Sequence, residues 1–282
     1  MRAIDVHLHP STVPMERTLG KYRDEMLRYY RRTTPTRTEE EMVEDYRAMD
    51  VVGIPVAFDA ETATGEPPCT NDYVASLVTR FPDVFIESFA SVDPLKGEAA
   101  TREAVRAVKE LGMMGVKFAP LVQGFALNDR RFYPLWETIQ GLGVPVQVHM
   151  GTTGLGAGSP GGLGIKLEYG RPIPYLDEFA ADFPNLRIIA CHPGWPWHDE
   201  LIAVLLHKGN VVSELSGWMP KYFPPTLVHE IGGRLQDKIM FGSDYPALSP
   251  KRWLDEFADM FPQSVQDKVF RDNARRILGL KV

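Results

Sequence analysis

Near its N-terminus the chain reads Ala3-Ile4-Asp5-Val6-His7-Leu8-His9, a short apolar run that is closed by histidines. Short strands that alternate with helices indicate βαβ units and a parallel sheet. Eight such units in 282 residues favour a closed (β/α)₈ barrel over an open doubly wound sheet. Seven further runs of this kind follow, at residues 52–58, 85–91, 114–118, 144–150, 186–192, 211–215 and 239–243, and helical apolar spacing lies between most of them, at 97–111, 133–142, 174–183, 196–207 and 224–235.

Composition narrows the class of protein. Hydrophobic residues make up 44% and charged residues 24%, which is typical of a globular domain, and we expect one domain over 1–282. The net charge of −6 speaks against nucleic acid as a partner, because phosphate binding needs a basic surface. Two cysteines, Cys69 and Cys191, cannot form a disulfide framework, and no run is long enough to span a membrane. These features predict a cytoplasmic protein that acts on a small molecule.

Two segments interrupt the regular spacing. Residues at about 11–45 lie between the first two expected strands and are rich in Arg, Glu and Tyr, which predicts a helical insertion. This insertion is either a solvated hairpin or a lid that contributes to the substrate pocket. Residues 151–164 (GTTGLGAGSPGGLG) lack the ending of a phosphate-binding loop, so we expect a mobile loop after the fifth strand.

Polar residues close four of the expected strands. His7 and His9 end the first strand, His149 the fifth, His192 the sixth, and Asp244 the eighth. The carboxyl ends of barrel strands meet on one face, where active sites of this fold lie. Imidazoles and a carboxylate gathered there predict one bound divalent cation. A single histidine of this kind is more often a simple hydrogen-bonding residue, and it is the cluster that carries the prediction.

Strand alternation predicts which way these side chains point. Residues i and i+2 share a face, so His7, His9 and Asp5 should all face the barrel interior, with Asp5 one layer deeper. By the same rule Cys191 should point away from the pocket that His192 faces. We therefore do not expect Cys191 to act as a nucleophile.

The chain resembles the amidohydrolase superfamily, and within it the amidohydrolase-2 branch, which is similar to aminocarboxymuconate semialdehyde decarboxylase. The resemblance runs nearly from end to end. It rests on residues 4–9 (IDVHLH), 147–151 (QVHMG), 191–194 (CHPG), 241–246 (FGSDYP) and the C-terminal helix at 273–278 (NARRIL).

The resemblance implies roles for individual residues. The metal ligands would be His7, His9, His149 and Asp244, and His192 would carry a proton or polarise the reacting group. Lys117 lies where relatives with two metals place a carboxylated lysine, although this branch usually holds one metal. Zn²⁺ is the leading expectation because imidazole suits it, and Mn²⁺ is second because of the carboxylate. Relatives are often homodimers or larger homo-oligomers.

Two reactions are compatible with these residues. In the first, a hydrolase, Asp244 would take a proton from metal-activated water and His192 would donate one to the leaving atom. The alternative is a non-oxidative decarboxylase of a small aromatic or dienoic acid, in which His192 or Asp244 protonates carbon. We expect the hydrolase, because the glycine-rich loop suggests a pocket cover unlike that of the decarboxylases. A metal-free binding protein is disfavoured by the complete set of site residues.

Several residues are candidates for substrate binding. Arg31 and Arg32 of the insertion could bind a substrate carboxylate, or could belong to a solvated helix face. Trp195 could stack on an aromatic substrate or could pack its own loop. Lys117 could reach the substrate or be hydrogen-bonded inside the barrel.

Overall fold

The eight expected strands are all present in the structure, a computed structural model that describes residues 1–282. They pair in parallel, β1 with β2 and β3 through β8 in chain order. Backbone hydrogen bonds close the ring: Val6 N–H donates to Phe241 O at 3.0 Å, and Ala57 N–H donates to Phe89 O at 2.9 Å. The predicted (β/α)₈ barrel is therefore confirmed. Its strands are β1 (Ala3–Leu8), β2 (Val51–Pro55), β3 (Phe89–Ser91), β4 (Gly115–Phe118), β5 (Val146–His149), β6 (Ile188–Cys191), β7 (Val211–Glu214) and β8 (Ile239–Met240).

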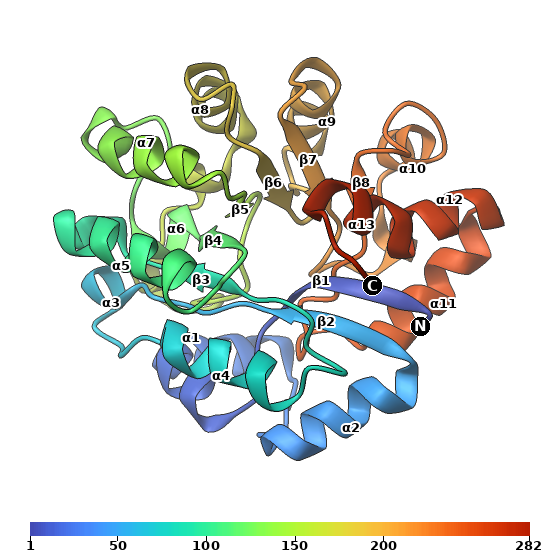
Figure 1. The fold of residues 1–282 in the computed structure, drawn as a ribbon, viewed down its shortest axis with the longest axis horizontal. Helices are drawn as coiled ribbons and strands as arrows, with labels where there is room; N and C mark the ends of the chain where they lie inside the picture. The colour runs from blue at the N-terminus through green and yellow to red at the C-terminus, as the bar shows by residue number, and fades with distance from the viewer.

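Helices surround the strands, and α5 and α7 to α11 are clearly seen outside them (Figure 1). Thr38 caps the N-terminus of α2. Its hydroxyl accepts from Glu41 N–H, and its own N–H donates to the Glu41 carboxylate, so these two residues of the sequence form a capping box. The α-helices are α1 (Val13–Tyr30), α2 (Glu39–Met49), α3 (Glu61–Thr64), α4 (Asn71–Arg80), α5 (Glu98–Lys109), α6 (Pro120–Gln123), α7 (Tyr133–Leu142), α8 (Asp177–Asp182), α9 (His198–His207), α10 (Pro225–Ile231), α11 (Pro250–Met260), α12 (Gln263–Asp267) and α13 (Asn273–Leu278). Shorter 3₁₀ or π turns are η1 (Pro94–Lys96), η2 (Arg130–Phe132), η3 (Pro160–Gly164), η4 (Leu167–Gly170), η5 (Pro172–Leu176), η6 (Pro220–Tyr222) and η7 (Lys268–Asp272).

The barrel interior changes from apolar to polar along the barrel axis. Its lower part is an apolar cluster, and Ala274 and Ile277 of α13 pack against this cluster. The inward-facing titratable side chains, such as Lys117, His149 and Glu214, lie nearer the carboxyl ends of the strands, which is where the active sites of this fold are found. The members of the lower cluster that come from the strands and their immediate continuations are Ile4, Val6, Ile54, Val56, Phe89, Ile189, Val212 and Met240.

A β-bulge in β1 reverses one expected side-chain direction. The register slips between Asp5 and Leu8, so simple alternation does not run through His7. Ile4 and Val6 join the inner cluster, whereas Asp5 accepts from Tyr46 Oη of α2 at 2.8 Å and from Ser243 N–H at 2.9 Å. The expectation that Asp5 shares a face with His7 and His9 is wrong. Asp5 instead holds the backbone next to Asp244.

The two irregular segments pack against each other. Helix α1 bends at Gly20, which has φ 42° and ψ −135°. The glycine-rich loop lies against α1, where Gly156 N–H donates to Tyr22 O at 3.1 Å. Gly156 has φ 74°, and a Cβ atom there would lie 2.5 Å from the backbone oxygen Gly162 O, so the loop requires glycine at this position. Together α1 and residues 151–164 form one cover over the end of the barrel.

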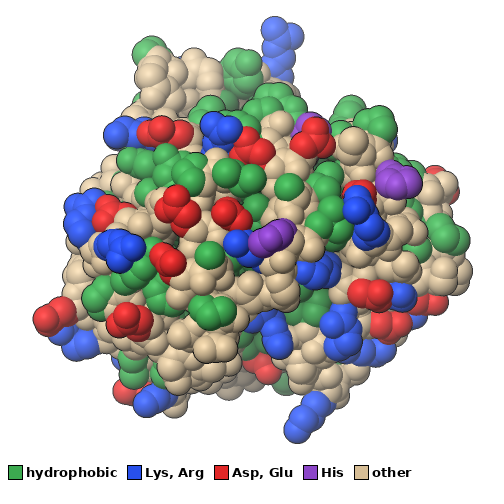
Figure 2. All heavy atoms as spheres, turned by 90° about the horizontal axis from the view of Figure 1, so that it is seen from above, with side chains coloured by type: hydrophobic (Ala, Val, Ile, Leu, Met, Phe, Trp, Pro, Cys, Tyr) green, Lys and Arg blue, Asp and Glu red, His purple; other side chains and the backbone are tan.

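The outer surface carries charges of both signs. Figure 2 shows acidic and basic side chains interspersed with hydrophobic ones over the face in view. None of the helices combines the length and the apolar composition that a membrane span requires.

Candidate metal centre and active site

A cavity of about 480 Å³ lies at the carboxyl end of the barrel, beneath α1 and the glycine-rich loop. Its polar floor contains His9, Lys117, His149, His192 and Asp244. The structure thus brings four of the five predicted site residues to one cavity, and His7 lies fully buried directly behind them.

Three of the predicted ligands face one another at distances that suit a metal. His7 Nε2 lies 3.3 Å from His9 Nε2, and Asp244 Oδ1 lies 3.8 Å from the first nitrogen and 3.6 Å from the second. Two ligand atoms on a tetrahedral zinc are about 3.3 Å apart, given bonds of ~2.0–2.1 Å. This donor set, two imidazoles and a carboxylate, fits a divalent cation.

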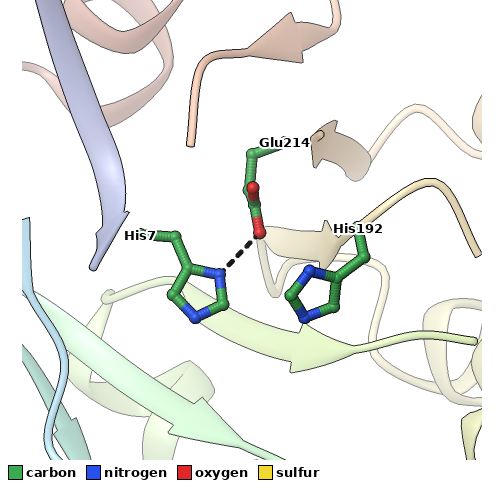
Figure 3. A group of neighbouring side chains, drawn as sticks. All are labelled: His7, His192 and Glu214. Carbon is green, nitrogen blue, oxygen red and sulfur yellow. Dashed lines mark hydrogen bonds and ion pairs between the residues drawn. The ribbon is translucent and has the colours of Figure 1, made fainter. Parts of the chain in front are cut away.

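Glu214 of β7 sets the orientation of the His7 ring. His7 Nδ1 donates to Glu214 Oε1 at 2.8 Å (Figure 3), so the Nε2 lone pair is left facing His9 and Asp244. Both side chains are fully buried. A carboxylate that accepts from the far nitrogen of a ligating histidine fixes its tautomer and makes it a better ligand.

Ser216 extends this arrangement to His192. Its hydroxyl donates to Glu214 Oε1 at 3.0 Å and lies 2.9 Å from His192 Nδ1. Ser216 N–H also donates to Glu214 Oε2 at 2.7 Å. The buried carboxylate therefore organises both His7 and the histidine that we expect to move protons.

His149 and His192 form a close pair. His149 Nδ1 lies 3.0 Å from His192 Nε2. The other nitrogen of each ring faces a backbone carbonyl, Thr152 O at 3.0 Å for His149 and Ser216 O at 3.0 Å for His192. Carbonyls only accept, so in neutral rings the two facing nitrogens both lack a proton, and their contact requires a shared proton or a cation.

This pairing separates His149 from the other expected ligands. The atoms grouped at ligand distance are those of His7, His9 and Asp244, or of His7, His192 and Glu214. His149 lies in the same cavity but directs its Nδ1 at His192. Its role as the fourth ligand stays a prediction.

Burial and Lys117 control the charge of these groups. Burial, assisted by the Lys117 ammonium, lowers the pKa of His9 to about 3 and the pKa of His149 to about 4. The pKa of His7 is also lowered, by the same two causes. Burial raises the pKa of Asp244 to about 6, which Lys117 opposes. Neutral imidazoles are the forms that bind metal, so the lowered histidine pKa values favour coordination, whereas the raised pKa of Asp244 and the nearby Lys117 ammonium oppose it.

Lys117 lies deeper than the substrate-binding prediction implied. Its Nζ lies 3.3 Å from His7 Nε2 and donates to Cys191 Sγ at 2.9 Å. Cys191 therefore points into the barrel, and the expectation that it points away from the site is wrong. The alternation rule failed because His192, with φ 71°, takes a left-handed conformation and also turns inward. Burial raises the pKa of the Cys191 thiol, which disfavours a thiolate nucleophile.

Two site residues have unusual backbone conformations. His192 and Asp244 have φ of 71° and 59°, a region that residues other than glycine rarely adopt. Gly217 allows the close approach, because a Cβ there would lie 2.9 Å from His192 Nδ1. Such conformations concentrate at functional sites, where the surrounding structure holds them.

The predicted substrate-binding residues separate into two groups. Arg32 lines the cavity, whereas Arg31 is exposed at the end of α1 and does not line it. Trp195 is 48% exposed and packs against Trp218, with ring centroids 5.6 Å apart. It is Trp218 that lines the cavity.

Sequence reasoning missed Glu214 and Ser216. Glu214 ends β7 and Ser216 lies two residues beyond it, so one signal was present: Glu214 is two residues after the inward-facing Val212. A charged residue at an inward position near the carboxyl end of a barrel strand indicates a functional role.

The sequence matches the amidohydrolase family (Amidohydro_2) over residues 4–280. The chain belongs to the amidohydrolase family. It is 31% identical over 112 residues to the γ-resorcylate decarboxylase of Polaromonas sp., a match covering 36% of this chain and 33% of that protein. It is 25% identical over 240 residues to the 2-amino-3-carboxymuconate-6-semialdehyde decarboxylase of Dictyostelium discoideum, covering 74% of this chain and 65% of the other.

A solved structure shows the same fold. The dihydroxybenzoic acid decarboxylase of Polaromonas sp., which holds manganese and the inhibitor 2-nitroresorcinol, superposes with a TM-score of 0.63 at 20% identity. The superposition covers 99% of this chain and 97% of that one. The curated relatives match over less than two thirds of their own length, so their activities enter only as proposals below.

Glu214→Gln is expected to weaken metal binding 10- to 100-fold, the usual effect of removing a partner of a ligating histidine. Glutamine has nearly the same size as glutamate but carries no charge. The charge-assisted hydrogen bond from His7 Nδ1 to the carboxylate is therefore lost. Metal affinity measured by competition with a chelator checks this. Glu230→Gln, which breaks the ion pair of this buried α10 carboxylate with Arg234, is the matched control, and equal affinities for both variants would contradict the role assigned to Glu214.

Proposed function

We propose that this amidohydrolase is a metal-dependent carboxy-lyase that removes CO₂ from a small aromatic or dienoic acid without oxidation. The observation that carries the proposal is the decarboxylase activity named for the two relatives described above, together with His192 in the same cavity as the ligand group. Hydrolysis, our expectation from the sequence, rested on the glycine-rich loop. That loop packs on α1 as part of the cover, and the residues it brings to the cavity are Thr152, Thr153, Gly154 and Leu155, none of them titratable.

The residues that would hold the metal are His7, His9 and Asp244, with His149 as the predicted fourth ligand. A divalent cation supplies Lewis-acid attraction for substrate carboxylate or phenolate oxygens when it is bound. We infer a single cation, Zn²⁺ from the imidazole-rich set or Mn²⁺ from the related decarboxylase.

The chain's own residues account for the proton that decarboxylation needs. Loss of CO₂ leaves an electron pair on the ring or alkene carbon, and that carbon must receive one proton. Ser216 O accepts from His192 Nδ1, so the proton for carbon has to be held on Nε2, in the 3.0 Å contact with His149 Nδ1, and its delivery leaves the His192 ring neutral.

Deuterium labelling tests this proposal. Metal-loaded protein incubated in D₂O with 2,6-dihydroxybenzoate, or with other hydroxybenzoates and dienoic acids, is expected to release CO₂ and to place one deuterium on the carbon that carried the carboxylate. Mass spectrometry and CO₂ release measure both products. If no acid in this panel loses CO₂ while a lactone or amide is hydrolysed, the carboxy-lyase proposal fails and the hydrolase replaces it.

A further inference from the structure

One wall of the cavity is continuous apolar surface that begins at the metal centre. The ring of Phe58 lies 6.1 Å from the ring of His9, centroid to centroid. Phe58 belongs to the same buried cluster as Met15 and Val122, and Leu19 and Leu155 pack against that cluster. All five of these apolar residues line the cavity. The wall therefore runs from a predicted ligand up to α1 and the glycine-rich loop.

The charged groups of the cover are already paired with each other. Arg23, which lines the cavity, donates to Glu16 Oε1 at 2.6 Å and to Thr34 O at 3.0 Å. Glu16 also accepts from Thr36 Oγ1 at 2.6 Å. These bonds leave the apolar side chains of α1 to contact a ligand beneath the cover, whereas Arg32, which follows α1 and also lines the cavity, has only a backbone contact, to Ala247 O at 3.5 Å.

The cavity is larger than a single-ring acid requires. Its volume of about 480 Å³ falls within the ~300–1,000 Å³ of pockets that hold drug-sized ligands. A hydroxybenzoate with its carboxylate at the metal ligands would leave the space under α1 unfilled. Apolar surface left facing water in this way favours a ligand that covers it.

We propose that the substrate is an aromatic acid that carries an apolar substituent, such as an alkyl chain or a second ring. The substituent lies against the wall formed by Met15, Leu19, Phe58, Val122 and Leu155. The acid group of this substrate rests on the proposed function. The apolar substituent is inferred from the wall.

Binding of unreactive phenols tests the substituent separately from catalysis. Resorcinol and its 5-methyl, 5-propyl and 5-pentyl derivatives carry no carboxylate to lose, and calorimetry on metal-loaded protein measures their affinity. Each buried methylene is expected to tighten binding about fourfold, so the pentyl derivative should bind on the order of 10²-fold more tightly than the methyl one. Affinity that is unmeasurable, flat or falling with chain length overturns the proposal.

A matched pair of α1 variants locates the substituent. Leu19→Gln should remove much of the gain with chain length, because it places an amide in the wall. Val13→Gln makes the same chemical change at a residue that is 48% exposed and does not line the cavity, and it should leave the gain unchanged. An equal gain in both variants also overturns the proposal. Failure of the carboxy-lyase proposal appears instead as absent CO₂ release, which this binding series does not measure.

Discussion

His9→Ala is expected to leave the purified protein with little of the roughly one equivalent of divalent metal that the intact site should hold. His9 Nε2 lies 3.3 Å from His7 Nε2 and 3.6 Å from Asp244 Oδ1, so its removal takes one donor out of a group of three. Activity should fall with metal content. Elemental analysis and kcat on the same preparation check both parts.

His198→Ala is the matched control. His198 begins α9, is 24% exposed, and does not line the cavity, so this variant should keep its metal. A chain of this size buries enough surface to fold without a metal, and the circular dichroism spectra of both variants should match that of the unaltered protein. A His9→Ala preparation that retains one equivalent would contradict the metal centre described here.

The same measurement on His149→Ala decides the fourth ligand. We expect metal loss here as well. If this variant keeps its metal, His149 acts only through its 3.0 Å contact with His192, and the ligand set is His7, His9 and Asp244.

His192→Asn should lower kcat by roughly 10²–10⁴-fold and keep the metal, which is the usual effect of removing a positioned general acid or base. Asparagine can still donate to Ser216 O, the partner of His192 Nδ1, but it cannot carry a proton to the substrate. Measuring kcat and metal content on one preparation separates the roles.

Two outcomes would contradict the proton-transfer role of His192. Loss of metal would make it a ligand, which its position 3.0 Å from His149 Nδ1 makes physically reasonable. Metal kept with nearly normal kcat would make it a scaffold residue that holds Ser216 and the loop after β7.

The sequence alone determined the barrel and the end of it that carries chemistry. Eight short apolar runs separated by helical spacing predicted the eight strands, because strand and helix periodicities differ and each can be seen locally. Residues that close strands, such as His9, His149 and Asp244, were predicted to meet because parallel barrel strands end on one face. The structure brings them to one cavity.

The directions of individual side chains were decided by the tertiary structure. Asp5 faces α2 because of the bulge in β1, and Cys191 faces inward because His192 is left-handed. Alternation assumes one regular backbone conformation, and a bulge or a positive φ breaks it without a clear signal in the sequence.

Contacts between distant segments were also beyond the sequence. Glu214 orients His7, although the two residues are 207 positions apart in the chain. Arg32 rather than Arg31 lines the cavity, because α1 ends at Tyr30 and Arg31 then adopts a left-handed conformation. The local sequence pattern predicts which residues share a face of one helix or strand. An active site, in contrast, is formed by residues from several elements that meet in space. The periodicity of the chain therefore determined the barrel and the end that carries the site, and only the packing of β1, β7 and α1 decided which side chains complete it.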